Sequence, residues 1–257
     1  MIPVYDVIVV GGGHAGCEAA AAAANLGSKT LLITMDMTKY GQMSCNPAMG
    51  GIAKGQIVRE IDALGGYSGI IADKTTIQFR MLNKSKGPAM WSPRAQNDRF
   101  RFTELWRDTL ESIEKLDLWQ DVVTQLIIKD KVVEGVITKI GIKFKAKTVI
   151  LTNGTFLNGL MHIGSAKLKG GRIGEAASYD ISEQLFDLGF KTGRLKTGTP
   201  VRIDGRSIDF SELIEQKGDV GHYKFSYLPD TESQLKKRSC WITHTNPKVH
   251  NELEKGF

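Results

Sequence analysis

A cysteine stands in a loop built mostly from small and flexible residues. The stretch GQMSCNPAMGG, residues 41–51, contains Cys45 with three glycines, two methionines and a proline, and no charged residue. A free thiol has a pKa of about 8.5, and a helix N-terminus or a nearby cation increases its thiolate fraction at neutral pH. We expect a helix from about Ile52, with Lys54 close by. Cys45 is therefore the candidate catalytic residue, although packing as a small buried hydrophobe is the commonest role of a free cysteine.

A glycine-rich turn is the second candidate site. GGGHAG contains the spacing Gly11-x-Gly13-x-x-Gly16, directly after an apolar strand and at the start of a helix, which is the context of a dinucleotide site. Gly11 would permit the tight turn, Gly13 the approach of a pyrophosphate, and Gly16 the close packing of helix on strand. A plain sharp turn is the alternative. The cofactor-binding candidates here are Gly11, Gly12, Gly13, His14, Ala15 and Gly16.

The elements around this turn predict a βαβ unit. Residues 4–10 form a short β-branched strand, residues 14–26 an alanine-rich helix, and residues 29–33 a second apolar strand. Dinucleotide folds usually have an acidic residue at the end of the second strand, to hold a ribose. Thr34 stands there and Asp36 follows two residues later, so we do not predict a carboxylate contact to a ribose.

Further along the chain, a β-meander indicates which dinucleotide is expected. The expected elements are a helix at 52–64, a strand at 75–82, a loop at 85–98 with two prolines, a helix at 98–115, and meander strands at 122–129, 131–137 and 142–151. A βαβ core with such a meander, ending in the turn Thr152-Asn153-Gly154, resembles the two-dinucleotide-binding flavoproteins. The resemblance favours FAD over NAD. The expected fold is α/β, a Rossmann-like parallel sheet with an antiparallel meander, plus a small inserted α+β module.

Composition sets the class of protein. The chain has 257 residues, 41% hydrophobic and 24% charged, which suits one large domain or two modest ones. Its three cysteines lack any C-x-x-C spacing, and its histidines show no ligand spacing, so we expect neither a disulfide framework nor a metal site. Cys17 is expected in the core, and Cys240 is unassigned. Without a basic leader or an apolar run of membrane length, a cytoplasmic protein is expected.

Positive charge gathers near the expected domain boundary. The net charge is +6, and a short stretch is rich in cations, with Asp204 opposing them: Lys191, Arg194, Lys196, Arg202 and Arg206. It could hold the phosphates of a nucleic acid or of an anionic nicotinamide cofactor, or be a solvated basic face. We expect a flavin domain at 1–200 and an inserted module at 201–257 that contacts this cofactor or the nucleic acid, with the boundary near Pro200.

Longer strings carry a more specific resemblance. GGGHAGCEAA, GQMSCNPAMGGIAKGQIVREIDALGG, KGPAMWSPRAQNDR, RLKTGTPVRIDGRSIDFS and CWITHTN are similar to the MnmG (GidA) family of bacterial tRNA uridine-modifying flavoproteins, and the similarity covers residues 1–257. The SCNPA-GGIAKGQ and PRAQ-DR strings are far more specific than any glycine motif.

The resemblance implies a function and further site residues. With the GTPase MnmE, family members add a carboxymethylaminomethyl or aminomethyl group at C5 of the wobble uridine of tRNA. They use FAD, NADH and methylene-tetrahydrofolate. Residues 11–16 match the family's FAD phosphate loop, Val123 and Ser178 match further FAD contacts, and Cys45 matches one of two required cysteines. The other would lie beyond residue 257, as would the part that engages MnmE. The chain thus resembles an N-terminal fragment, inactive alone and homodimeric at full length.

Two other functions remain open from the sequence. One is a folate- and FAD-dependent tRNA uridine methyltransferase, a smaller relative, although the uninterrupted SCNPAMGGIAKGQ string favours the MnmG family. The other is a non-catalytic flavin- or RNA-binding module. A purified protein whose yellow colour is bleached by NADH would indicate the enzyme, and a colourless one that only binds tRNA would indicate the module.

Overall fold

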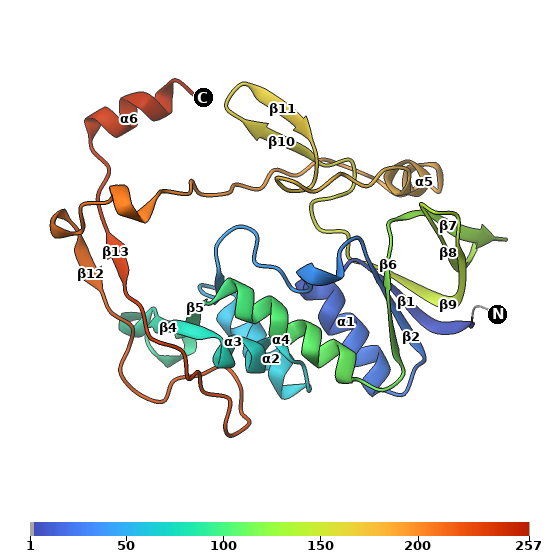
Figure 1. The fold of residues 1–257 in the computed structure, drawn as a ribbon, viewed down its shortest axis with the longest axis horizontal. Coiled ribbons are helices and arrows are strands. Elements are labelled where there is room, and N and C mark those ends of the chain that lie inside the picture. Colours follow the sequence, from blue (N-terminus) through green and yellow to red (C-terminus); the bar gives the residue numbers. More distant parts are fainter. Residues whose placement is uncertain (1–2, 257) are drawn as a thin grey trace.

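A mixed six-stranded sheet organises the chain. The computed structural model describes residues 3–256 (Figure 1). The strands are β1 (Tyr5–Val10), β2 (Thr30–Thr34), β6 (Leu116–Gln120), β7 (Val123–Lys129), β8 (Val132–Thr138) and β9 (Lys143–Leu151), in the order β6-β2-β1-β9-β8-β7. The first four in this order are parallel, and β9, β8 and β7 pair antiparallel. The Rossmann-like sheet with a meander is thereby confirmed, with β9 belonging to both.

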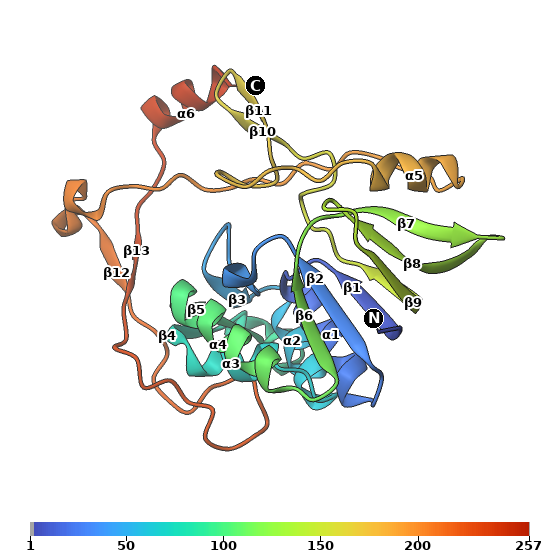
Figure 2. The same cartoon turned by 45° about the vertical axis from the view of Figure 1, so that its right-hand side comes forward.

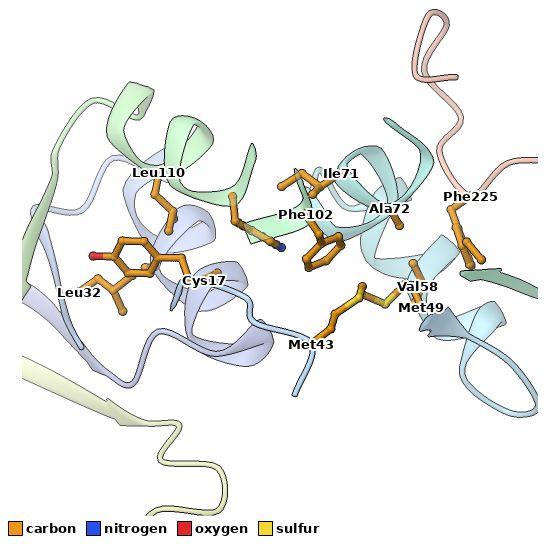
Figure 3. Packing of buried hydrophobic residues seen from close by; sticks show 14 of the residues in the cluster. Cys17, Leu32, Met43, Met49, Val58, Ile71, Ala72, Phe102, Leu110 and Phe225 are labelled. Atoms are coloured by element: carbon orange, nitrogen blue, oxygen red, sulfur yellow. The ribbon is translucent and has the colours of Figure 1, made fainter. Parts of the chain in front are cut away.

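Helices cover one face of the parallel strands. α1 (His14–Asn25) and α4 (Arg99–Ser112) pack there, and alanines give α1 a slim face for close contact. Val9 and Leu32 point to this face and join Cys17, Phe102 and Leu110 in a continuous apolar core (Figure 3). The expected core position of Cys17 is confirmed, since its side chain is fully buried.

The opposite face of the same strands packs against the meander. Ile8, Val10 and Ile33 alternate with the residues named above and meet Val136 and Phe144 of the meander. The short helix α5 (Ile181–Asp187) adds Ile181 to this second core. Burial on both faces explains why the strand sequences are almost continuously apolar.

A smaller sheet extends the first core. It consists of β3 (Ala48–Gly50), β4 (Thr76–Leu82) and β5 (Ser92–Asn97), with β5 in the middle, and α2 (Gly55–Ala63) and α3 (Ser68–Lys74) pack beside it. Short 3-10 turns lie at Met37–Lys39 (η1), Lys84–Lys86 (η2), Pro88–Met90 (η3), Gly205–Ser207 (η4) and Phe210–Glu212 (η5).

Two expectations about these elements were wrong. The region 85–98 is not wholly a loop, because β5 lies within it. Pro93 has no N–H to donate, but its carbonyl oxygen accepts a hydrogen bond from Gly51 N–H at 2.8 Å, and the strand therefore tolerates a proline at this position. The helix expected at 98–115 ends at Ser112, and the missed strand β6 follows it and extends the parallel sheet. Leu116 and Leu118 pack on the first core, and this supplies the stability that a five-residue strand lacks locally.

The remaining chain is more open. β10 (Leu160–Ile163) pairs with β11 (Ala166–Lys169), and β12 (Ile214–Gln216) with β13 (Cys240–Ile242), before α6 (Pro247–Glu254). A long extended segment connects α5 to η4 and crosses above the first sheet (Figures 1 and 2). The division at about Pro200 stays a prediction. No helix in residues 3–256 is long and apolar enough to cross a membrane.

Two buried carboxylates attach a distant segment to the first core. Asp73 in α3 accepts hydrogen bonds from the N–H groups of Phe225 and Ser226, both at 2.8 Å, and Asp62 in α2 accepts one from Tyr227 N–H at 2.8 Å. The Phe225 ring enters the apolar core beside them. Burial raises the pKa of Asp73 to about 6, although its hydrogen bonds and the charge of Lys224 act in the opposite direction.

This attachment predicts a pH-dependent stability. The pKa of Asp73 in the folded protein lies above its value of about 3.9 in an unfolded chain. Its contribution to the free energy of unfolding is therefore complete below pH 4 and declines by about 3 kcal/mol as the pH rises through 6. Asp73→Asn does not titrate, so the stability difference between parent and Asp73→Asn should decrease from pH 4 to pH 7 in urea unfolding.

Asp209→Asn provides a control, because the pKa of Asp209 is shifted in the opposite direction to that of Asp73. Hydrogen bonds from Ser211 lower the pKa of the Asp209 carboxyl, so its contribution is already complete above pH 4 and should not decline toward pH 7. A constant difference between parent and Asp73→Asn over this range would contradict the role given to Asp73.

Candidate functional site

A cavity of about 600 Å³ opens at the carboxyl edge of the parallel strands. The ends of three neighbouring strands, β2, β1 and β9, meet there with the glycine turn, the loop after β2, and the turn after β9. Parallel strands present their following loops at one edge, which is where α/β folds bind ligands. The volume suits a ligand of cofactor size.

The three glycines of the motif meet different surroundings. Gly11 has a φ of +109°, and a Cβ there would lie 2.5 Å from the carbonyl oxygen of Thr152. A Cβ on Gly16 would lie 1.7 Å from the carbonyl oxygen of Gly11, so any side chain would push α1 off the sheet. Gly13 has an ordinary φ of −76°, and no atom lies within 4 Å of its Cβ position. Gly11 and Gly16 therefore serve the fold, while Gly13 leaves space at the cavity.

The N-terminus of α1 is free to bind an anion. Gly13 is the N-cap residue and offers no side-chain cap, and the first turn carries no acidic residue. The first N–H groups of a helix lack partners within the helix, and the helix dipole favours negative charge beside them. Burial, together with the charge of Arg172, lowers the pKa of His14, so its imidazole is neutral at pH 7 and packs 5.5 Å from the Phe102 ring.

Val123 and Ser178 lie together on another wall of the cavity. Ser178 Oγ donates a hydrogen bond to the carbonyl oxygen of Val123 at 3.4 Å. Next to them stands Asp121, which also lines the cavity and has one buried carboxylate oxygen without a partner among the described residues. That oxygen is available to accept a hydrogen bond from a ligand. Asp121 was missed in the sequence because β6, the parallel strand that it follows, was not recognised.

A group of charged side chains also lines the cavity. Arg172 donates to Gln42 Oε1 and lies 3.7 Å from Glu175, which also pairs with Lys39 at 3.3 Å. Asp36 lines the cavity as well, but its oxygens accept from Thr38 and pair with Lys39 at 3.1 Å. Arg172 and Glu175 could not be found in the sequence, because they stand about 130 residues from Gln42 in an irregular segment.

Cys45 lines the same cavity as the glycine turn. Its side chain is half-buried, and Sγ donates to the carbonyl oxygen of Gly198 at 3.3 Å. The expected helix N-terminus does not follow directly, because β3 intervenes and α2 begins only at Gly55. The loop is instead fixed at its start, where Gly41 N–H bonds to the carbonyl oxygen of Gly12 at 2.9 Å. A Cβ on Gly41 would lie 2.4 Å from the Trp106 ring.

The other two cysteines lie elsewhere. Burial raises the pKa of the Cys17 thiol to about 12, and its Sγ donates to the Gly12 carbonyl at 3.3 Å. Cys240 lies in β13 and contacts Gln78 Oε1 at 3.2 Å. Of the three thiols, Cys45 is therefore the one at the cavity. Within residues 3–256, no group of three or more His, Cys, Asp or Glu side chains is arranged to hold a metal ion.

The structure thus brings most of the expected site residues together. Around one cavity lie Cys45, Gly11, Gly12, Gly13, His14, Ala15, Val123 and Ser178, whereas Gly16 packs behind the turn. Their catalytic and cofactor-binding roles stay predictions. A parallel sheet with a glycine turn at its carboxyl edge and an antiparallel meander defines the two-dinucleotide-binding flavoprotein fold.

Comparison with known proteins identifies the family. The chain belongs to the family described as glucose inhibited division protein A (GidA), whose profile matches residues 6–257. It is 63% identical over 257 residues to the tRNA uridine 5-carboxymethylaminomethyl modification enzyme MnmG of Cytophaga hutchinsonii, and 64% identical over 253 residues to that of Parabacteroides distasonis. These matches include 100% and 98% of this chain, but only 41% and 40% of the lengths of the two relatives.

Solved structures agree with this assignment. GidA of Aquifex aeolicus matches with a TM-score of 0.94 at 46% identity, over 99% of this chain and 43% of that one. A GidA-related protein from Thermus thermophilus matches with a TM-score of 0.52 at 22% identity, over 85% of this chain and 74% of that one, and shows a shared fold.

The glycine turn predicts opposite outcomes for two matched substitutions. Gly16→Ser should lower the free energy of unfolding by about 2–3 kcal/mol or more, because its Cβ overlaps the Gly11 carbonyl. Gly13→Ser should leave it within about 0.5 kcal/mol, since serine is a favourable N-cap residue and space is open there. Urea unfolding measures both variants. Equal destabilisation would contradict the division of roles within the motif.

Proposed function

We propose that the chain is the flavin-binding part of an enzyme that modifies the wobble uridine of tRNA at C5. One observation supports this most: Cys45 and the open N-terminus of α1 line the same cavity. A cofactor bound through its phosphates at the helix could thus lie close to a thiol. The names of the relatives, tRNA uridine 5-carboxymethylaminomethyl modification enzymes, supply the reaction.

The cavity residues fit FAD. The N–H groups at the start of α1 would hold the pyrophosphate, and Gly13 would let it approach. Val123, Ser178 and the unpartnered oxygen of Asp121 would offer hydrogen-bond partners to polar groups of the ligand. His14 and Ala15 would line the phosphate site beside Gly11 and Gly12. When bound, FAD supplies the redox chemistry of the reaction.

Cys45 would act on the uridine. Its thiolate could attack C6, forming an S–C6 bond while the electrons of the C5–C6 double bond move to C5. C5 then attacks a one-carbon electrophile, and loss of the C5 proton with cleavage of the S–C6 bond restores the ring. Alternatively, Cys45 could serve as a general acid or base for a second cysteine.

The remaining components are part of the same proposal. Methylene-tetrahydrofolate would supply the carbon and NADH the reducing equivalents, and the GTPase MnmE would be the partner of a homodimeric protein of family length in the cytoplasm. Because the chain spans only about 40% of the length of these relatives, the complete reaction is assigned to the longer protein. Residues 1–200 would then be the FAD-binding domain and residues 201–257 an inserted module.

FAD binding is tested at Gly13. Gly13→Val places a branched side chain in the open space beside the turn, so FAD affinity should fall at least about tenfold, while stability without FAD changes by only about 1 kcal/mol. Gly193→Val is a matched control, because that glycine is also unobstructed but does not line the cavity. Quenching of flavin fluorescence measures the affinity. Unchanged binding by folded Gly13→Val would refute the phosphate site.

The role of Cys45 is tested in a protein of family length. Cys45→Ser should keep FAD affinity and the unfolding midpoint, but lose at least about 99% of tRNA modification, because a hydroxyl is a far weaker nucleophile than a thiolate. Cys240→Ser is the control, since serine can keep the contact with Gln78. Analysis of tRNA nucleosides by mass spectrometry provides the measurement. Near-normal turnover by Cys45→Ser would exclude a catalytic role.

A further inference from the structure

An exposed extended segment passes beside the Cys45 loop. Residues 190–204, here called the basic arm, contain no helix or strand, and every residue from 191 to 203 is exposed. Figures 1 and 2 show the arm running from α5 across the molecule toward η4. An extended, solvated backbone of this kind presents its side chains to large ligands.

Two arginines fix the arm to the protein. Arg194 Nη2 donates to the carbonyl oxygen of Asn158 at 3.1 Å. Arg202 Nη2 donates to the carbonyl oxygens of Ser44, at 3.3 Å, and of Cys45. Cys45 Sγ in turn donates to the Gly198 carbonyl at 3.3 Å. The arm is therefore held at the point where Cys45 reaches the cavity.

These attachments leave the positive charge of the arm uncompensated. Both arginines bind neutral carbonyls, and none of the ion pairs within residues 3–256 includes Lys191, Arg194, Lys196 or Arg202. Arg206 differs, because Asp204 pairs with it at 2.7 Å. Four cations within twelve residues thus have no acidic partner among the described residues, on an arm whose Gly198 and Arg202 contact Cys45.

The distribution of the charges decides between two kinds of anion. Lys191 and Arg202 are eleven residues apart, so an extended chain separates them by up to about 40 Å. A nicotinamide dinucleotide carries its phosphates close together and could meet only part of such a row. A nucleic-acid backbone carries a phosphate at every nucleotide and can follow the whole arm.

We propose that the basic arm, through Lys191, Arg194, Lys196 and Arg202, contacts the phosphates of the RNA strand on either side of the nucleotide that reaches Cys45. The inference rests on the proposed function and adds which surface of this chain holds the tRNA. Phosphate contacts of this kind position the strand without reading its sequence.

Lys191 and Lys196 give the cleanest test, because both are exposed and neither side chain makes a hydrogen bond or ion pair within the described residues. The double variant Lys191→Ala/Lys196→Ala removes two charges and should leave the unfolding midpoint unchanged. Its affinity for an unmodified tRNA transcript should fall about tenfold or more at low salt. The slope of log K against log salt should decrease by about 1.4–1.8, because each phosphate that a lysine neutralises contributes about 0.7–0.9 to it.

A matched control has the same charge change on another element. Lys139→Ala/Lys143→Ala removes two exposed lysines near the β8–β9 turn, which also lie outside the described ion pairs. Its affinity and salt slope should equal those of the parent. An arm variant that binds tRNA like the parent would overturn the inference and leave the proposed function standing. If the unsubstituted chain binds no tRNA, both the inference and the proposal that this part of the enzyme binds tRNA are overturned.

Thiol modification tests the position of the RNA. Bound tRNA should slow the reaction of Cys45 with a thiol reagent at least about fivefold, whereas Cys240 should react at its usual rate. At the same tRNA concentration, Lys191→Ala/Lys196→Ala should lose most of this protection. Protection that survives in the arm variant, or a variant that loses affinity for NADH and keeps it for tRNA, would overturn the inference.

Discussion

The close approach of α1 to the sheet is the constraint on which the site depends. A Cβ on Gly16 would lie 1.7 Å from the carbonyl oxygen of Gly11 and 2.7 Å from Thr152 Oγ1, so only a glycine lets helix and strands meet here. Thr152 Oγ1 donates to the carbonyl oxygens of Val10 and Gly11 at 2.9 and 3.0 Å. This contact joins the ends of β1 and β9 to the start of α1 and places the helix N-terminus at the cavity.

The position of Cys45 follows from the same contact. Gly12 leaves room for Thr34 and Tyr40, and its carbonyl accepts the Gly41 N–H that begins the Cys45 loop. The Trp106 side chain of α4 packs directly against Gly41, which has a φ of +59°. The glycine turn thus supports both the open helix end and the loop with the thiol. A substitution that moved α1 would displace the cavity and Cys45 together.

Charge is arranged unequally around this site. Inside the cavity, Arg172 and Lys39 pair with Glu175 and Asp36, and Asp121 adds a further carboxylate, so the cavity carries no excess of positive charge. Outside it, the arginines of the basic arm bind carbonyls and keep their charge. A cavity without excess positive charge suits a cofactor whose phosphates bind at the helix end, and a charged rim suits a polyanion. This division fits the proposed binding of a flavin cofactor and of an RNA strand.

The sequence by itself determined the elements with strong local patterns. The βαβ unit, the glycine turn and the meander were predicted within a few residues, because apolar periodicity and glycine spacing are local properties of the chain.

Only the tertiary structure decided where β5 and β6 lie, since β5 contains a proline and β6 depends on packing of Leu116 and Leu118. It also decided that Asp121 and Arg172 line the cavity and that the basic arm lies beside Cys45. Cys45 and Gly198 are 153 residues apart, as are Asp73 and Ser226. Contacts over such separations form when the whole chain folds, and no periodicity in the sequence records them.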